Sequence, residues 1–286
     1  MLEKATFQIA LLAALTLHTA CATQDDELSE TPEISELAAQ QAAPAPGAAG
    51  PRCVKKPTQV MIIGDSYINW PTHTFPTDLQ AASAQRGWRL EALGGASMNS
   101  GGIALQVPDQ FELAYAFDPD VHTVVMDGGG NDVLIPDPLI DTFSECKNSR
   151  NSANLRQCQR IVESSLSRAS KLFERMASVG VRDVVYFYYP HVPNGTLLGG
   201  ANPNVIADYA LPKWRDLCNT TEQRTGGKLR CHFVDMVPVF EGHSNWFFPF
   251  DIHPNSQGSR AMAKAVWDKM KSTCVGQPES SGCCTP

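Results

Sequence analysis

The sequence predicts an α/β protein in which helices cover both faces of one parallel sheet. Short apolar runs rich in β-branched residues alternate with longer amphipathic stretches, which is the pattern of repeated βαβ units. Such connections are right-handed, so consecutive strands are expected to lie parallel. The expected strands span residues 58–63, 88–93, 121–126, 183–189 and 232–236.

Helices are expected between these strands and after the last one. Residues 155–179 carry apolar side chains at helical spacing, and Gly180 is a typical stop signal. Residues 256–271 form the last expected helix, which Asn255 or Ser256 would cap. Pro212 is expected to interrupt a helix over residues 205–224, because proline lacks the N–H that a helix interior needs. The other expected helices span residues 75–87 and 103–117.

The composition is that of an ordinary globular protein and argues against a nucleic-acid partner. Of the 286 residues, 43% are hydrophobic, which is enough for the core of one large domain. The formal net charge is −7, and the sequence contains no run of basic residues that would neutralise phosphates. The charge does not identify a substrate, and the sequence does not indicate an oligomeric state.

Residues 1–21 have the features of a signal peptide. Lys4 precedes an apolar run over residues 5–17, which is too short to cross a bilayer. The small residues before Cys21 are similar to a bacterial lipoprotein cleavage site, where Cys21 would be lipidated and would tether the protein to a membrane. Plain secretion is the alternative. The protein is therefore expected to be secreted, or anchored as a lipoprotein in the periplasm or at the cell surface of a bacterium.

One folded domain is expected after a long tether. Residues 22–54 are first acidic and then rich in Ala, Gln, Pro and Gly. Such a composition buries too little apolar surface to offset the chain entropy, so this segment should link the export signal to the domain. The domain is expected over residues 55–275, followed by a cysteine-containing tail over residues 276–286.

The cysteines of the domain and tail indicate disulfides. Eight cysteines remain when Cys21 is set aside, and an even number is typical of an exported, disulfide-bonded chain. Their spacing does not resemble that of a zinc site. Proximity in sequence favours two pairs, Cys146 with Cys158 and Cys218 with Cys231. Cys53 is then expected to pair with Cys274, or with one of the two adjacent cysteines Cys283 and Cys284.

The chemistry is expected to centre on Ser66, which follows the first strand in the sequence Gly64-Asp65-Ser66. In open α/β sheets, ligands bind where the parallel strands end. The other polar or glycine-rich turns span residues 94–97, 127–132 and 250–255, and the topology would bring them to the same edge. The simpler interpretation of Gly-Asp-Ser alone is a turn in which Asp or Ser caps a helix.

These turns contain the groups that acyl transfer needs. The reaction requires a nucleophile, a base within hydrogen-bond reach, and donors for the developing oxyanion. Ser66 is the candidate nucleophile and His253 the candidate base, held on a turn by the proline that follows it. The Gly95 backbone and the Asn131 side chain are candidate N–H donors. The alternative is structural: Ser66 and Asn131 as turn or cap residues, and His253 as a surface histidine before the last helix.

Four motifs, in order, resemble those of the SGNH (GDSL-type) hydrolases. They are Gly64-Asp65-Ser66, Gly95-Ala96-Ser97, Gly129-Gly130-Asn131-Asp132 and His253-Pro254-Asn255. The resemblance covers roughly residues 58–270, so it makes the domain at residues 55–275 an SGNH hydrolase domain. It implies a flavodoxin-like three-layer α/β/α sandwich with a five-stranded parallel sheet. It also implies a serine esterase or lipase without metal or cofactor, with an oxyanion hole formed by the Ser66 N–H, the Gly95 N–H and the Asn131 side chain.

The acid that would orient His253 departs from the family pattern. The family usually places it three residues before the histidine, where this chain has Phe250, whereas Asp251 lies two residues before. Asp251 is the expected acid, and Asp235 is a second candidate. The alternative is a serine–histidine dyad in which a backbone carbonyl near Trp246 or Phe250 accepts the ring N–H. In the second motif Gly94 and Gly95 are adjacent. Gly95 is the expected donor, because it begins the Gly-x-Ser sequence that matches the family block better.

Several neighbours of these motifs have structural or substrate-binding interpretations. Asp65 and Asp132 are expected to hold turns by accepting backbone N–H bonds, and His191 is expected to be a loop residue. Residues 190–212 are expected to form a long loop that borders the cleft and affects specificity. Tyr67, Trp70, Phe75 and residues 246–250 are either core or an apolar wall of the acyl site.

The sequence therefore favours an exported serine esterase or lipase that hydrolyses carboxylic esters through an acyl-enzyme. A carbohydrate O-acetyl esterase would use the same machinery, and its partner would be a glycan rather than a lipid or small-molecule ester. A non-catalytic surface module that binds glycan or lipid has no need of an activated serine. A transferase that passes the acyl group to an alcohol is a further alternative.

Overall fold

The computed structural model describes residues 53–70, 74–99, 105–134, 146, 152–196 and 203–283. All of them belong to the compact unit Ala42–Pro286. The expected signal peptide, Cys21 and residues 22–52 of the expected tether lie outside the described residues. Cys53 and Val54, at the start of the described residues, are buried.

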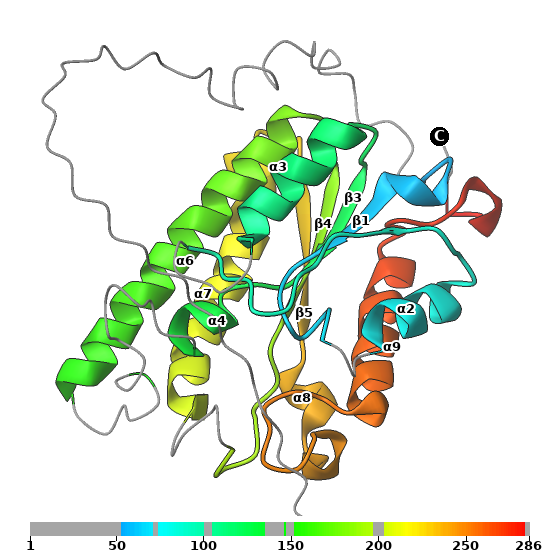
Figure 1. Ribbon diagram of the computed structural model, residues 1–286. Helices are drawn as coiled ribbons and strands as arrows, with labels where there is room; N and C mark the ends of the chain where they lie inside the picture. The colour runs from blue at the N-terminus through cyan, green and yellow to red at the C-terminus, as the bar shows by residue number, and fades with distance from the viewer. Residues whose placement is uncertain are drawn as a thin grey trace, which may run out of the picture. The chain divides into compact units, whose positions relative to one another are not determined.

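A five-stranded parallel sheet forms the centre of this unit, in the order β2-β1-β3-β4-β5 (Figure 1). The alternating sequence pattern predicted such a sheet, and the prediction is confirmed. Four strands end within one residue of their expected last residue, while β2 keeps only two residues. The strands are β1 Val60–Ile63, β2 Arg89–Leu90, β3 Thr123–Met126, β4 Asp183–Tyr188 and β5 Arg230–Asp235.

Helices cover both faces of the sheet, which gives the expected three layers (Figure 1). One face carries α3 (Val107–Phe117), α6 (Ser152–Ser178) and α7 (Pro203–Arg224), and the other carries α2 (Phe75–Ser83) and α9 (Ser256–Ser272). Short helices follow two strands, α4 after β3 and α8 after β5 (Gly130–Leu134 and Val237–Phe240). Single 3₁₀ turns lie at Pro57–Gln59, Ser244–Trp246 and Glu279–Ser281.

The strands alternate their side chains between two hydrophobic cores. In β1, Met61 and Ile63 pack on the side of α3, α6 and α7, while Val60 and Ile62 pack on the side of α2 and α9. Every residue of β1, β3 and β4 is buried. Strands covered on both faces are apolar throughout, which is why the sequence shows continuous apolar runs.

Helix α7 corrects two expectations about residues 190–212. In the described part of this segment, residues 190–196 form a loop, and the chain is helical from Pro203 onward. The helix also continues through Pro212 without the expected interruption. Proline removes a single hydrogen bond from a helix of 22 residues, and buried side chains on both sides of Pro212 hold the helix on the sheet: Ala210, Trp214 and Leu217.

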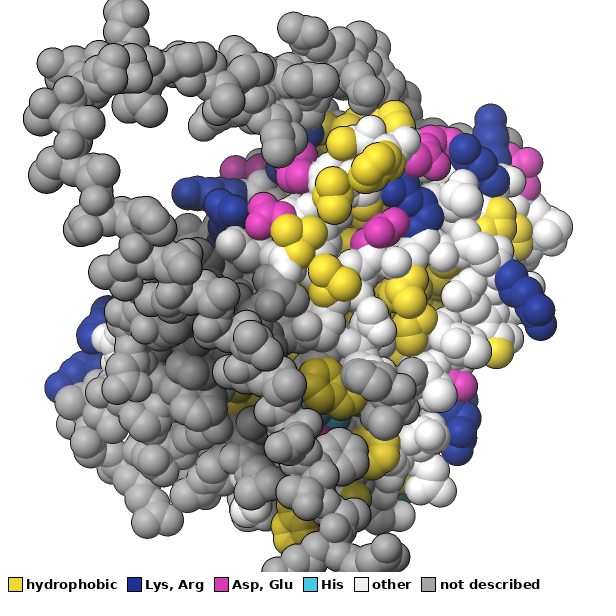
Figure 2. Space-filling view, in the orientation of Figure 1, with side chains coloured by type: hydrophobic (Ala, Val, Ile, Leu, Met, Phe, Trp, Pro, Cys, Tyr) yellow, Lys and Arg dark blue, Asp and Glu magenta, His cyan; other side chains and the backbone are white. Residues whose placement is uncertain are grey.

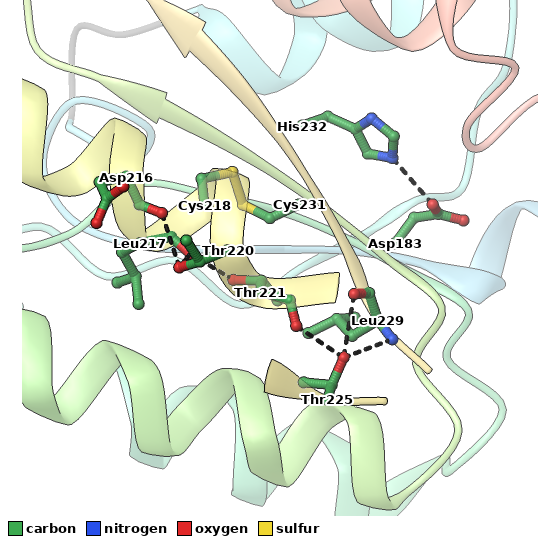
Figure 3. Close-up of a disulfide and its surroundings, with 10 residues drawn as sticks. All are labelled: Asp183, Asp216, Leu217, Cys218, Thr220, Thr221, Thr225, Leu229, Cys231 and His232. Carbon is green, nitrogen blue, oxygen red and sulfur yellow. Dashed lines mark hydrogen bonds and ion pairs between the residues drawn. A yellow bond between two sulfur atoms is a disulfide. The ribbon is translucent and has the colours of Figure 1, made fainter. Parts of the chain in front are cut away.

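The disulfides of the described residues join segments that are close in sequence. The expected pairs Cys146–Cys158 and Cys218–Cys231 are both present. Figure 3 shows the second, which connects α7 to β5. In the same view, Thr225 accepts a hydrogen bond from the Leu229 N–H and so ties the end of α7 to the start of β5.

The third disulfide rules out two of the three expected partners of Cys53, and the remaining one, Cys284, lies outside the described residues. Cys274 pairs with Cys283 and is therefore not available to Cys53. A turn brings these two cysteines together within nine residues, which makes the local pair the cheaper loop to close. Cys53 is itself disulfide-bonded, to a partner outside the described residues.

The tail packs against the beginning of the domain. The Val54 N–H donates to the Gln277 carbonyl at 2.9 Å, and Val54 pairs with Pro278 in an isolated parallel bridge. Val275 and Gln277 are buried.

On the outer surface, apolar side chains gather over α3 among charged ones (Figure 2), and the large exposed apolar residues of that helix are Leu113 and Phe117. Scattered apolar side chains of this kind are ordinary on a protein surface.

Candidate active site

The turn that follows β1 is fixed by buried hydrogen bonds. The Gln110 side chain of α3 accepts from the Gly64 N–H at 2.8 Å and donates to the Gly64 carbonyl at 3.0 Å. Gly64 has φ +142°, and a Cβ at this position would lie 1.9 Å from Oδ1 of Asp127. Only glycine fits there, and the backbone conformation just before Ser66 is therefore fixed.

His253 connects Ser66 to Asp251. Its Nε2 lies 2.8 Å from Oγ of Ser66, and its Nδ1 lies 2.8 Å from Oδ1 of Asp251. The same carboxylate oxygen accepts the backbone N–H of His253 at 3.2 Å. Both Ser66 and His253 are buried, at 4% and 2% exposed. The structure thus brings together three groups that the sequence separates by up to 187 residues.

The loop before His253 explains the one-residue departure from the family pattern. Phe250 has φ +61°, in the left-handed region that side-chain-bearing residues seldom adopt. The loop closes through hydrogen bonds from the Phe248 N–H to the His253 carbonyl at 3.0 Å and from the Asp251 N–H to the Phe248 carbonyl at 3.1 Å. The reversal at Phe250 brings Asp251 to the histidine ring.

The structure places the expected acid, Asp251, against the ring, because His253 Nδ1 contacts its carboxylate. Asp235 is occupied elsewhere, because it accepts the Val237 N–H at 2.9 Å and pairs with Arg215 at 2.6 Å. It holds the turn after β5.

Three groups form the candidate oxyanion hole. Asn131, in α4, donates from Nδ2 to the Ala96 carbonyl at 2.7 Å, which links it to the turn that contains Gly95. An amide nitrogen carries two hydrogens, so a second N–H of Asn131 remains for a ligand. Within the described part of the chain, the backbone N–H groups of Ser66 and Gly95 donate to no protein acceptor. At the adjacent Gly94, a Cβ would lie 2.8 Å from the Asn69 carbonyl oxygen, so this position leaves no room for a side chain.

Asp132 and Asp65 hold turns, as expected. Asp132 accepts the N–H groups of Met98 and Asn99 at 2.7 and 2.8 Å, and burial raises its pKa. Asp65 accepts the Tyr67 N–H at 3.0 Å. Both carboxyls are therefore part of the framework on which the candidate donors are mounted.

A buried network beneath Ser66 was not predicted. The Tyr189 hydroxyl donates to Oδ2 of Asp65 at 2.6 Å and accepts the Gly130 N–H at 3.1 Å. Burial and the Asp65 charge raise the pKa of Tyr189 well above its usual value, so this phenol stays protonated. The network ties the Ser66 turn to the Asn131 turn. Its only sequence signal is Tyr189 at the end of the fourth expected strand.

Asp127 forms a second unpredicted part of this network. Its Oδ1 accepts the Asp65 N–H at 2.7 Å, while its Oδ2 is buried and has no hydrogen-bond partner among the described residues. Burial, and then the charge of Asp65, raise the pKa of Asp127 well above its usual value. Burial also raises the pKa of Asp65. We infer that Asp127 is the protonated member of the pair, because two adjacent buried carboxylates repel each other.

Of the aromatic residues that the sequence analysis singled out, Tyr67 lines the pocket at Ser66 and is also part of the core. Phe75 is core, where it packs on Phe187. Trp70 stacks on the His253 ring, with centroids 4.6 Å apart and planes at 9°. Within residues 246–250, Phe247 is buried in the core and Phe250 is 74% exposed. Trp70, Phe75 and residues 246–250 do not line the pocket at Ser66.

A pocket opens at Ser66 and Asn131 and extends between α6 and α7. As expected, it is bordered by residues of the segment 190–212: Pro190, Val192, Asn204, Ile206, Ala207 and Ala210. His191 lies outside it and pairs with Asp208 at 2.6 Å on the surface. In the described part of the chain, no cluster of three or more His, Cys, Asp or Glu side chains is placed to hold a metal. The described helices also include none that is long and apolar enough to span a bilayer.

Comparisons with known proteins identify the family and the fold. The family model of the GDSL-like lipase/acylhydrolase family matches residues 62–261, more than half of the chain. An extracellular lipase from Streptomyces rimosus superimposes with a TM-score of 0.50 at 16% identity, over 74% of this chain and 98% of that one. Est24, a carbohydrate acetylesterase from Sinorhizobium meliloti, gives 0.50 at 13% identity, over 74% and 98%. A search of curated protein sequences found no match.

Proposed function

Because the chain belongs to the GDSL-like lipase/acylhydrolase family, we propose that it is a serine ester hydrolase that forms an acyl-enzyme on Ser66. The observation that carries this proposal is the His253 ring, which lies within 2.8 Å of both the Ser66 hydroxyl and the Asp251 carboxylate. A serine oxygen, an imidazole and a carboxylate in this order are the arrangement that activates serine for acyl transfer.

In the first half of the reaction, Ser66 Oγ attacks the ester carbonyl carbon while its proton passes to Nε2 of His253. Asp251 holds the ring with Nδ1–H facing the carboxylate and stabilises the imidazolium that forms. The carbonyl oxygen becomes an oxyanion that accepts hydrogen bonds from the N–H groups of Ser66, Gly95 and Asn131. The bond to the alcohol then breaks, and His253 gives its proton to the departing alkoxide.

In the second half, water replaces the alcohol. His253 takes a proton from the water as it attacks the acyl carbon, the same three donors hold the oxyanion, and the proton returns to Ser66 Oγ as the carboxylic acid leaves. A binding module would gain nothing from a serine held against an imidazole, so the non-catalytic alternative has no observation in its favour.

We also propose that the protein is exported. Disulfides persist in oxidising compartments, and the described residues include three complete ones. The signal-peptide features of residues 1–21 point the same way. Whether Cys21 carries a lipid is tested by metabolic labelling with a fatty-acid analogue, which would mark the wild type and spare Cys21→Ala.

The function is tested by hydrolysis of p-nitrophenyl acetate. Ser66→Ala should lower kcat on the order of 10³-fold or more, because no other group replaces the nucleophile. Ser259→Ala is a matched control: Ser259 is also buried, and its Oγ has no hydrogen-bond partner among the described residues. That variant should retain wild-type activity. Full activity in Ser66→Ala would overturn the proposal.

A further inference from the structure

We propose that the pocket between α6 and α7 binds the acyl group of the ester, and that this group is an aliphatic chain of several carbons. The inference rests on the proposed function and names its substrate class. It is carried by three observations: which catalytic groups line the pocket, what its walls are made of, and where the polar side chains in those walls make their hydrogen bonds.

The reaction determines which side of the ester faces the pocket. His253 must protonate the departing alkoxide, so the alcohol lies beside the imidazole. The pocket is lined by Ser66 and Asn131 at its reactive end, and the His253 ring is not among its lining residues. The oxyanion points at the N–H donors. The remaining substituent of the carbonyl carbon, which is the acyl chain, is therefore directed into the pocket.

The pocket walls are apolar. Aliphatic and aromatic side chains come from α4, α6, α7 and the segment after β4, and they include Val133, Val162, Val192, Ile206, Ala210 and Trp214. Trp214 is held in place because it stacks on Tyr186, with centroids 4.7 Å apart and planes at 5°. Its ring also packs against Gly129, where a Cβ would lie 2.6 Å from the ring. The indole is thus a rigid part of the wall.

The hydroxyl, amide and carboxylate side chains in the walls are already hydrogen-bonded within the protein. Asn204 accepts the Val192 N–H and donates to the Val192 carbonyl, both at 3.0 Å. Ser165 donates to the Ile161 carbonyl at 3.0 Å and accepts from Asn99 at 3.0 Å. The hydroxyls of the three tyrosines in the wall donate as well: Tyr67 to the Ile252 carbonyl, Tyr188 to the Ala207 carbonyl and Tyr189 to Asp65.

A hydrocarbon chain is the ligand that matches these walls. A polar acyl substituent would lose its hydrogen bonds to water and would find few new partners in the wall, at a cost for each buried group left unpaired. An acetyl group offers a single methyl, which leaves most of the apolar wall uncovered. Each further methylene buried there contributes to transition-state binding, at about 0.8 kcal/mol, or roughly fourfold in kcat/KM.

The test is a series of p-nitrophenyl esters with acyl chains from acetate to octanoate, assayed on the wild type and on two variants that fill the pocket. In the wild type, kcat/KM should rise at least tenfold from acetate to butanoate. Ala207→Phe and Ala210→Phe should each reduce kcat/KM for hexanoate at least tenfold more than for acetate, because both side chains line the pocket. Ala82→Phe, at an exposed helical position outside the pocket, should keep the wild-type profile.

The outcomes separate this inference from the proposed function. A wild type that prefers acetate, with hydrolysis still dependent on Ser66, overturns the acyl-chain assignment and leaves the serine hydrolase in place. A uniform loss on all esters in both pocket variants also overturns it, provided that the variants keep the wild-type circular dichroism. Absence of Ser66-dependent hydrolysis for every ester overturns the proposed function itself. The wild-type series decides the matter alone if both pocket variants fail to fold.

Discussion

Trp70 stacks face to face on the imidazole of His253, with ring centroids 4.6 Å apart and ring planes at 9°. The two residues are far apart in the sequence. Their contact fixes the plane of the His253 ring, while Ser66 and Asp251 fix the positions of its two nitrogens. The imidazole is thereby held on three sides.

Removing this stack should reduce catalysis more than stability. An aromatic pair contributes about 0.5–1.5 kcal/mol beyond its buried area, so Trp70→Ala should lower kcat between about two- and tenfold. Trp70→Phe keeps an aromatic face and should recover part of the loss. The measurement is kcat beside the thermal midpoint of each variant. A fall in kcat that merely follows a fall in folded fraction would contradict this role for Trp70.

Asp251→Asn should lower kcat on the order of 10²–10⁴-fold while leaving the fold unchanged. An asparagine amide that faces Nδ1 of His253 favours the wrong tautomer of the ring and provides no charge for the imidazolium. Asp235→Asn is the matched control, because Asp235 pairs with Arg215 away from the serine, and it should keep most of the activity. Equal losses in the two variants would show that Asp251 acts only on the fold.

Phe250 should tolerate glycine better than a β-branched residue. Its φ of +61° suits glycine and is strained for valine, which is stiff at χ1. Phe250→Gly should therefore retain most of the wild-type kcat, whereas Phe250→Val should lower kcat at least several-fold by displacing Asp251. The comparison is made at saturating substrate. The reverse order of activities would mean that the Phe250 side chain, and not its backbone, is what matters.

The sequence predicted those parts of the site that local motifs encode. Ser66, His253 and Asn131 each follow a strand or precede a helix in a recognisable motif, so their convergence at one sheet edge follows from topology. The position of Asp251 depends on the left-handed backbone of Phe250, which no residue type at that position signals. The contacts from Tyr189 and Asp127 to Asp65 span 124 and 62 residues, and leave no pattern in the local sequence.

The same reasoning explains the expectations that were wrong. The local rule for proline predicts a break near Pro212. The observed helix is continuous because packing holds it, and the local sequence does not reveal that packing. For Cys53 the structure excludes Cys274 and Cys283 as partners, because these two pair with each other, and leaves the expected partner Cys284 untested. Sequence spacing correctly predicted the pairs that are 12 and 13 residues apart, but it left the tail undecided.

The buried pair Asp65–Asp127 should make the folded state less stable as the pH rises. The pKa of Asp127 is raised well above 3.8 in the folded protein, so the folded state binds a proton that the unfolded state has released. The stabilisation is complete below about pH 4, the unfolded pKa, and is lost as the pH rises through the folded pKa. Asp127→Asn imitates the protonated carboxyl and should flatten this decline.

The check is urea unfolding at a series of pH values from 5 to 9 for the wild type and for Asp127→Asn. The free energy of unfolding should fall more steeply with pH in the wild type. Asp268→Asn replaces a surface carboxylate that pairs with Lys264 and Lys271, and it should keep the wild-type slope. Parallel curves for the wild type and Asp127→Asn would mean that Asp127 is ionised in the folded state.

The central claim is that Ser66 is the nucleophile and that His253 activates it. The most direct measurement is peptide mapping by mass spectrometry after reaction with a fluorophosphonate, which modifies activated serines. We predict one adduct, on the peptide that contains Ser66, which is absent in Ser66→Ala, forms far more slowly in His253→Ala and is unaffected in Ser259→Ala. An adduct on a different residue, or none on Ser66 while the protein still hydrolyses esters, would contradict the account.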